Sequence, residues 1–124
     1  MIPHDSAAIC LYDPDSSELR LHSFDLQYRS DLEEGALFPL EGTPEGRAFT
    51  SPQAVIVRRL DPEIFPAPQI RHAYKDGLRS GCSIPLIAQD RVLGTLDMAS
   101  PTEDAFNDED AGLNCDKEEG TKWA

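Results

Sequence analysis

Residues 79–100 have the sequence RSGCSIPLIAQDRVLGTLDMAS, and two apolar runs within this stretch flank a polar turn. The runs are Cys82–Ile87 and Val92–Met98, and the turn is Ala88–Arg91. Apolar runs of this length that are bounded by turn residues are typical of strands. The stretch therefore predicts two antiparallel strands joined in a hairpin.

Two residues are unusual for the interior of a strand. Pro85 has no N–H group to donate to a sheet ladder, so we expect it at a sheet edge or at an irregularity. Gly94 has no side chain to pack, and it predicts a bend or a close approach of another backbone segment. Both features restrict where this hairpin can sit in a sheet.

A second hairpin is predicted near the start of the chain. Ala7–Asp13 is apolar, and Glu18–Asp25 alternates between apolar and polar residues, as a strand with two different faces does. The residues between them, Pro14–Ser17, are common in turns. We expect these two strands to pair antiparallel.

The remaining elements are shorter. Thr43 is a suitable N-cap for a helix over Pro44–Thr50, and Ala54–Val57 is rich in β-branched residues. Pro68 can open a helix that runs to Asp76, and Asn107 can cap a last helix. Strands and helices in this order predict an α+β domain with one mainly antiparallel sheet.

Composition limits the classes of partner. The chain has 124 residues, enough for one domain, and its formal net charge of -12 repels nucleic-acid backbones and anionic membranes. The sequence contains no apolar stretch near the ~20 residues that a membrane span needs, and its first residues lack the pattern of a secretory signal. We therefore expect a cytoplasmic protein with no direct nucleic-acid contact and no membrane contact.

The three cysteines are Cys10, Cys82 and Cys115. They are far apart in the sequence, form no CxxC pair and match no metal-ligand spacing. Free thiols in a reducing compartment explain them most simply. The sequence implies neither a metal nor a cofactor.

Several short segments, in this order and spacing, carry a family resemblance. They are Leu40–Thr43 with Gly46 and Phe49, Asp61–Pro62, Gly77–Ser80, Ile84–Leu86, Leu93–Leu96, Ala105–Phe106 and Glu109–Asp110. From Ala7 to Leu113 the chain resembles a GAF domain. The pattern looks closest to the GAF domains of formate-hydrogenlyase-activator-type regulators, which precede AAA+ and DNA-binding domains in bacterial transcription regulators.

The resemblance implies a fold and a function. The fold is a GAF-like, PAS-related central antiparallel sheet of about five to six strands flanked by helices, with a ligand pocket covered by the segment Arg58–Arg79. Residues 1–113 would form a sensor domain that lacks the family's N-terminal helix, and residues 114–124 a charged tail. The implied function is non-catalytic binding of an unidentified small molecule and signalling to an effector domain. Family members usually form homodimers through their terminal helices, which are shortened here.

Two candidate ligand-binding residues lie in the main hairpin. Asp97 could accept hydrogen bonds from a ligand amine or hydroxyl if it points into the pocket, or face solvent together with Thr95 and Ala99. Cys82 could face the ligand, although a cysteine in a strand is more often a small buried apolar residue.

Four further candidates lie in the covering segment. Arg58 and Arg59 could bind a carboxylate through their guanidinium groups, or form surface ion pairs with nearby acids. His72 and Tyr74 could close over a ligand, or lie on a solvated helix face.

Two other functions stay open at this point. One is a ligand-free structural or dimerisation module. The other is a free methionine-(R)-sulfoxide reductase, an enzyme family built on the same fold. That family places its catalytic cysteines around the covering segment and the loop before the next strand, whereas Arg58–Arg79 has none and Cys82 lies within a strand. Ser100-Pro101 and Ala111 depart from the signature of cyclic-nucleotide-binding relatives.

Overall fold

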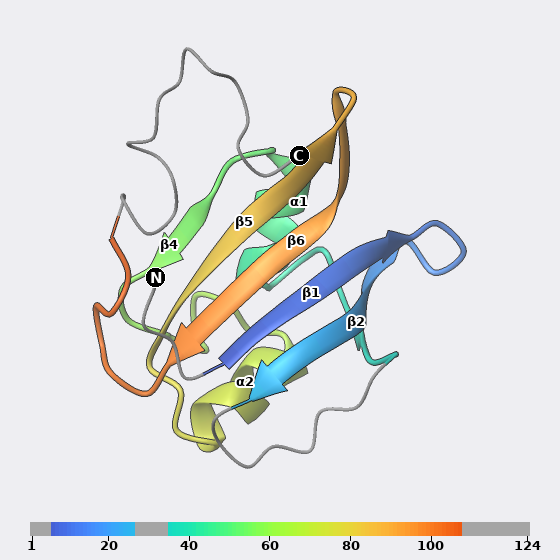
Figure 1. The fold of residues 1–124 in the computed structure, drawn as a ribbon. Helices are drawn as coiled ribbons and strands as arrows, with labels where there is room; N and C mark the ends of the chain where they lie inside the picture. Colours follow the sequence, from blue (N-terminus) through green and yellow to red (C-terminus); the bar gives the residue numbers. More distant parts are fainter. Residues whose placement is uncertain (1–5, 27–34, 108–124) are drawn as a thin grey trace.

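The computed structural model describes residues 6–26 and 35–107. They form one six-stranded antiparallel sheet of order β3-β2-β1-β6-β5-β4, with two helices on one of its faces (Figure 1). The predicted GAF-like α+β fold is confirmed. The elements are β1 (Ser6–Asp13), β2 (Glu18–Leu26), β3 (Leu37–Phe38), α1 (Pro44–Thr50), β4 (Val55–Val57), α2 (Pro68–Lys75), β5 (Ser80–Ala88) and β6 (Arg91–Ser100).

Both predicted hairpins are present. The β5–β6 hairpin is longer than expected, and it turns through Gln89 and Asp90, whose φ angles are 52° and 65°. Two positive φ angles in a two-residue loop are the geometry that matches the twist of paired strands. Pro85 lies beside the end of β4, which pairs only with Gly81–Ser83 of β5. The predicted sheet edge at Pro85 is therefore confirmed.

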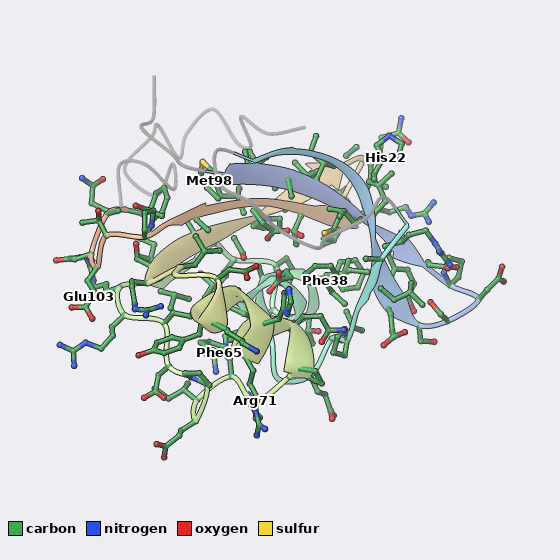
Figure 2. All side chains as sticks on the ribbon, turned by 90° about the horizontal axis from the view of Figure 1, so that it is seen from below. His22, Phe38, Phe65, Arg71, Met98 and Glu103 are labelled. Carbon is green, nitrogen blue, oxygen red and sulfur yellow. The ribbon has the colours of Figure 1, made fainter. Side chains whose placement is uncertain are left out.

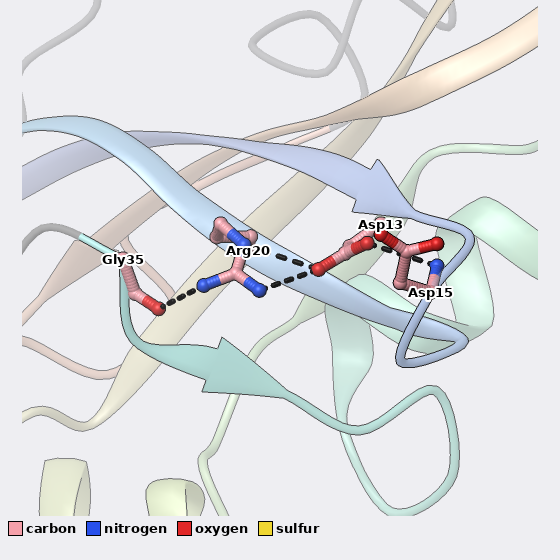
Figure 3. A network of polar contacts seen from close by, with 4 residues as sticks. All are labelled: Asp13, Asp15, Arg20 and Gly35. Carbon is pink, nitrogen blue, oxygen red and sulfur yellow. Dashed lines mark hydrogen bonds and ion pairs between the residues drawn. The ribbon is translucent and has the colours of Figure 1, made fainter.

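The sequence did not indicate β3, a strand of two residues that pairs with Leu19 and Arg20. Two residues are too few to show a strand period. Arg20 strengthens this region, because its guanidinium donates to the Asp13 carboxylate and to the Gly35 carbonyl oxygen, the latter at 3.1 Å (Figure 3). The hydrogen bonds from Arg20 and from the Asp15 N–H lower the pKa of Asp13.

The sheet separates two apolar layers. Figure 2 shows Met98 on the sheet face away from the helices and Phe65 beneath the sheet among them. Because successive strand residues point to opposite faces, Cys82, Ile84 and Met98 pack with Phe106 on the face opposite the helices, where all four are buried. The helix side holds two other buried clusters, one around Val57, Leu60, Phe65, Ala67, Ile70 and Leu78 and one around Cys10, Leu19, Leu21 and Phe38.

Thr43 holds the start of α1. Its Oγ1 accepts from the Gly46 N–H at 3.0 Å and donates to the Pro39 carbonyl oxygen at 2.7 Å, and its side chain is buried. We expect Thr43→Ala to lower the free energy of unfolding by about 1–2 kcal/mol, because both bonds are lost in a buried place. Urea denaturation measures the change, and Thr43→Ser, which keeps the hydroxyl, should recover most of it. An unchanged midpoint in Thr43→Ala would contradict the capping role.

The last predicted helix, which follows Asn107, lies outside the described residues, as does the predicted tail 114–124. Within the described part of the chain, neither helix is long and apolar enough to cross a membrane.

Candidate functional site

A cavity of about 110 Å³ lies between the sheet and the two helices. This is well above the ~10–15 Å³ that a single water needs. Its lining is mainly apolar, with a few polar side chains, as is common in ligand sites. The sheet contributes residues of β1, β5 and β6, α1 contributes its first turn, and the segment Leu60–Leu78 contributes the opposite side.

One face of α2 lines this cavity. Gln69, His72, Ala73 and Asp76 all border it, and the first three lie on α2 while Asp76 is its C-cap. These positions are three and four residues apart, which places them on one side of a helix. The His72 Nε2 atom lies 3.5 Å from Asp76 Oδ2. The predicted cover of the pocket is therefore present, and it presents polar groups as well as apolar ones.

Glu45 enters the cavity from the first turn of α1. The helix begins so close to the preceding loop that a Cβ on Gly46 would lie 1.8 Å from the Leu40 carbonyl oxygen. The helix packs against β5 and β6, and Glu45 is only 8% exposed. Its Oε1 atom has no hydrogen-bond partner among the described residues. Glu45 is thus a buried carboxyl group on the wall of the cavity.

Asp97 enters from β6, on the sheet face that the helices cover. The register places it beside Ala8 of β1 and Ser83 of β5, which also border the cavity. Thr95 Oγ1 donates to Asp97 Oδ2 at 3.0 Å, whereas Oδ1 is buried with no hydrogen-bond partner in the described part of the chain. The solvent-facing alternative for Asp97 is therefore wrong.

The two carboxyl groups influence each other. Burial, and next the charge of Asp97, raise the pKa of the Glu45 carboxyl above its usual range. Burial also raises the pKa of Asp97, against the opposing effect of hydrogen bonds from Ser83, Thr95 and Cys10. Removal from water disfavours a charged carboxylate, and a neighbouring negative charge does so further. The cavity is thus an apolar space in which negative charge is concentrated at one place.

The two described cysteines are buried free thiols. Burial, followed by the charges of Asp97 and Glu45, raises the pKa of the Cys10 thiol far above its usual range. The thiolate is the reactive form of cysteine, so this environment suppresses reactivity. Cys82 borders the cavity, but its side chain packs with Met98 on the opposite face of the sheet.

Comparison with known families assigns the chain. The family model described as "GAF domain" matches residues 2–113. The chain belongs to the GAF domain family. No curated protein matches it.

Solved structures with this fold include both enzymes and sensors. The free methionine-R-sulfoxide reductase of Neisseria meningitidis, solved with its substrate, is 27% identical with a TM-score of 0.68; the match covers 87% of this chain and 59% of the reductase. The GAF domain of a two-component sensor histidine kinase from Bacillus halodurans is 17% identical with a TM-score of 0.73, covering 91% and 75%. A GAF region of a putative membrane protein from Geobacter sulfurreducens is 25% identical with a TM-score of 0.66, covering 89% and 73%.

Of the predicted ligand-binding residues, this GAF domain brings His72, Cys82 and Asp97 to the cavity. Tyr74 lies on the outer side of α2, where it is 39% exposed and stacks under the Arg79 guanidinium. Arg58 and Arg59 lie at the surface, paired with Asp104 at 2.8 Å and with Glu103 at 3.3 Å. Ligand binding by any of these residues stays a prediction.

Sequence reasoning missed Glu45, Gln69 and Asp76. An acidic residue in the first turn of a helix is ordinarily explained by the helix dipole, so Glu45 carried no distinct signal. The helical spacing of Gln69 and Asp76 with His72 was visible in the sequence. No group of three or more His, Cys, Asp or Glu side chains in residues 6–26 and 35–107 could hold a metal ion.

Proposed function

We propose that this GAF domain is a non-catalytic sensor that binds a small molecule in the cavity between the sheet and the helices α1 and α2. The observation that carries the proposal is a mostly apolar cavity bordered by buried oxygens of Glu45, Gln69 and Asp97 that have no hydrogen-bond partner among the described residues. Buried polar groups are normally paired, and an unpaired one costs free energy. A bound ligand would supply the missing partners.

The signal would arise from a shift in conformational populations. A ligand that contacts α1, α2 and the sheet at once favours the conformers in which these elements are close together. We propose that the domain transmits this shift to an effector domain in a cytoplasmic bacterial regulator. The resemblance to regulators of the formate-hydrogenlyase-activator type suggests that this effector controls transcription. In a homodimer, the conformational shift in one copy would also act on the second copy. The sensor kinase domain of Bacillus halodurans supports the fold of such a module.

Free methionine-(R)-sulfoxide reduction is the second candidate, because the reductase of Neisseria meningitidis is 27% identical. The chemistry of Cys10 argues against it, since burial, followed by the charges of Asp97 and Glu45, raises the pKa of its thiol. Incubating the protein with free methionine sulfoxide, thioredoxin, thioredoxin reductase and NADPH decides the question. We expect no NADPH consumption above a blank that lacks the protein. Sustained turnover that a Cys10→Ser variant loses would replace the sensor proposal with the enzyme.

Native mass spectrometry tests the sensor proposal directly. We expect a freshly purified chain to carry a reproducible extra mass, or to bind members of a metabolite panel in NMR titrations. Ala8→Leu should abolish this binding, because Ala8 lines the cavity and the larger side chain fills it. Ala88→Leu, the same change on β5 outside the cavity lining, should retain it. A folded chain that retains no mass and responds to no panel member would favour the ligand-free structural or dimerisation module.

A further inference from the structure

Three buried oxygen atoms on the wall of the cavity share one chemical property. The buried atoms Glu45 Oε1, Asp97 Oδ1 and Gln69 Oε1 are all oxygens, and none has a hydrogen-bond partner in the described part of the chain. The amide nitrogen of Gln69 already donates to the Leu37 carbonyl oxygen at 2.9 Å, which identifies the remaining atom as an acceptor. An ionised carboxylate oxygen can only accept hydrogen bonds. A ligand group that binds at this end of the cavity therefore has to be a hydrogen-bond donor.

The acidic side chains of the cavity limit which kind of hydrogen-bond donor a ligand can carry. Glu45 and Asp97 both border the cavity, the charge of Asp97 disfavours that of Glu45, and burial disfavours the charge of both. A negative ligand would add repulsion, and a neutral one would bring no charge to offset theirs. A single positive charge offsets this cost. An ammonium group carries that charge together with three N–H donors.

The other surfaces of the cavity restrict the rest of the ligand. Apolar side chains of Val57, Leu60, Ile70, Ala73 and Leu78 border the space beyond the carboxyl groups. Burial of apolar surface there would contribute about 25 cal/mol per Å². The volume of about 110 Å³ has room for a short carbon chain. A divalent metal ion fits poorly, because such ions prefer six or more oxygen ligands.

We propose that the cavity binds a small primary amine whose ammonium group lies between the carboxylates of Glu45 and Asp97 and whose short apolar remainder packs against Val57, Leu60 and α2. This inference rests on the proposed sensor function and names the class of its ligand. Glu45 and Asp97 then determine specificity, and the positive charge of a ligand matters more for binding than its shape.

Three probes of one size separate the alternatives: n-butylamine, n-butanol and sodium butyrate, each titrated into the isotope-labelled chain and followed by NMR. We expect n-butylamine to shift resonances of residues around the cavity at concentrations at least tenfold lower than n-butanol or butyrate. Glu45→Gln and Asp97→Asn should each weaken n-butylamine binding at least tenfold, because each removes a carboxylate contact. Glu63→Gln, the same change at an exposed residue, should leave the affinity unchanged.

The outcomes distinguish the two proposals. Stronger binding of n-butanol or butyrate at the cavity would overturn the amine inference and leave the sensor proposal intact. So would n-butylamine binding that neither carboxyl variant affects. If none of the three probes shifts resonances of residues around the cavity, the amine inference is also overturned. The sensor proposal is then tested separately by native mass spectrometry. The comparison among probes uses the unaltered protein, so it stands even if a variant does not fold.

Discussion

Gly94→Ala is expected to prevent this domain from folding. Gly94 lies in β6, opposite Leu11 of β1. A Cβ at this position would lie 1.9 Å from the Cys10 carbonyl oxygen and 2.8 Å from the Leu11 Cα. Both contacts are with backbone atoms, so no side-chain rotation relieves them. Two central strands would have to separate, at a cost above the roughly 1–3 kcal/mol of ordinary overpacking.

Gly81→Ala provides the matched control. Gly81 also lies in a central strand, but its added Cβ would come no closer than 3.1 Å to the Met98 carbonyl oxygen. Small backbone shifts can accommodate that contact. Soluble yield, circular dichroism and urea denaturation should show a folded Gly81→Ala variant and an unfolded or insoluble Gly94→Ala variant. Equal stability of the two would show that the β1–β6 contact yields easily.

The stability of the ligand-free domain is expected to fall as the pH rises from about 5 to about 8. Burial, aided by mutual repulsion, raises the pKa of Glu45, and burial raises that of Asp97, so the folded state holds protons that the unfolded state has released. The stabilisation is complete below the ordinary carboxyl pKa of about 4 and is lost as the pH rises through the raised values. A tenfold difference in proton affinity between the folded and unfolded states corresponds to about 1.4 kcal/mol of stability.

The other shifted groups do not change their charge in this window. The raised pKa of Cys10 keeps its thiol neutral throughout. The pKa of Asp13 is lowered, which affects stability only at more acidic pH. The pH dependence between about 5 and 8 should therefore come mainly from the pair Glu45 and Asp97.

Glu45→Gln isolates the contribution of the pair. The variant removes one of the two buried acids and offers an amide that can donate to Asp97, so its stability should vary less with pH and exceed that of the parent at about pH 8. An increase of about 1 kcal/mol would raise the melting temperature by about 4 °C in a domain of this size. Glu63→Gln should follow the parent curve. Parallel curves for all three proteins would refute the raised pKa values assigned to the pair.

The sequence predicted those features of the fold that depend on local patterns. The two hairpins follow from apolar runs and turn residues, and Pro85 and Gly94 were correctly taken as marks of a sheet edge and a close backbone contact. The strand β3 was missed because two residues are too few to show the alternation of apolar and polar residues that marks a strand. Its position depends on pairing with Leu19 and Arg20, which local sequence does not encode.

The candidate site was predicted only in part, for a similar reason. Asp97 and His72 were chosen correctly as residues near the cavity, but Tyr74 is two residues from His72 and so lies on the other side of α2. Arg58 and Arg59 form surface ion pairs with Asp104 and Glu103. Glu45 becomes prominent only when the packing of α1 against the sheet buries it, and that contact is tertiary.

The short strand β4 also leaves part of the sheet edge open to strands of other molecules. β4 covers only Gly81–Ser83, so in the described structure the outer edge of β5 beyond Ser83 pairs with no strand. That edge continues through the apolar residues Ile84, Leu86 and Ile87, a composition that favours intermolecular β-sheet growth and aggregation. Pro85 stands in the middle of it and offers no N–H to an incoming strand. The proline thus acts as a gatekeeper that protects an otherwise adhesive edge.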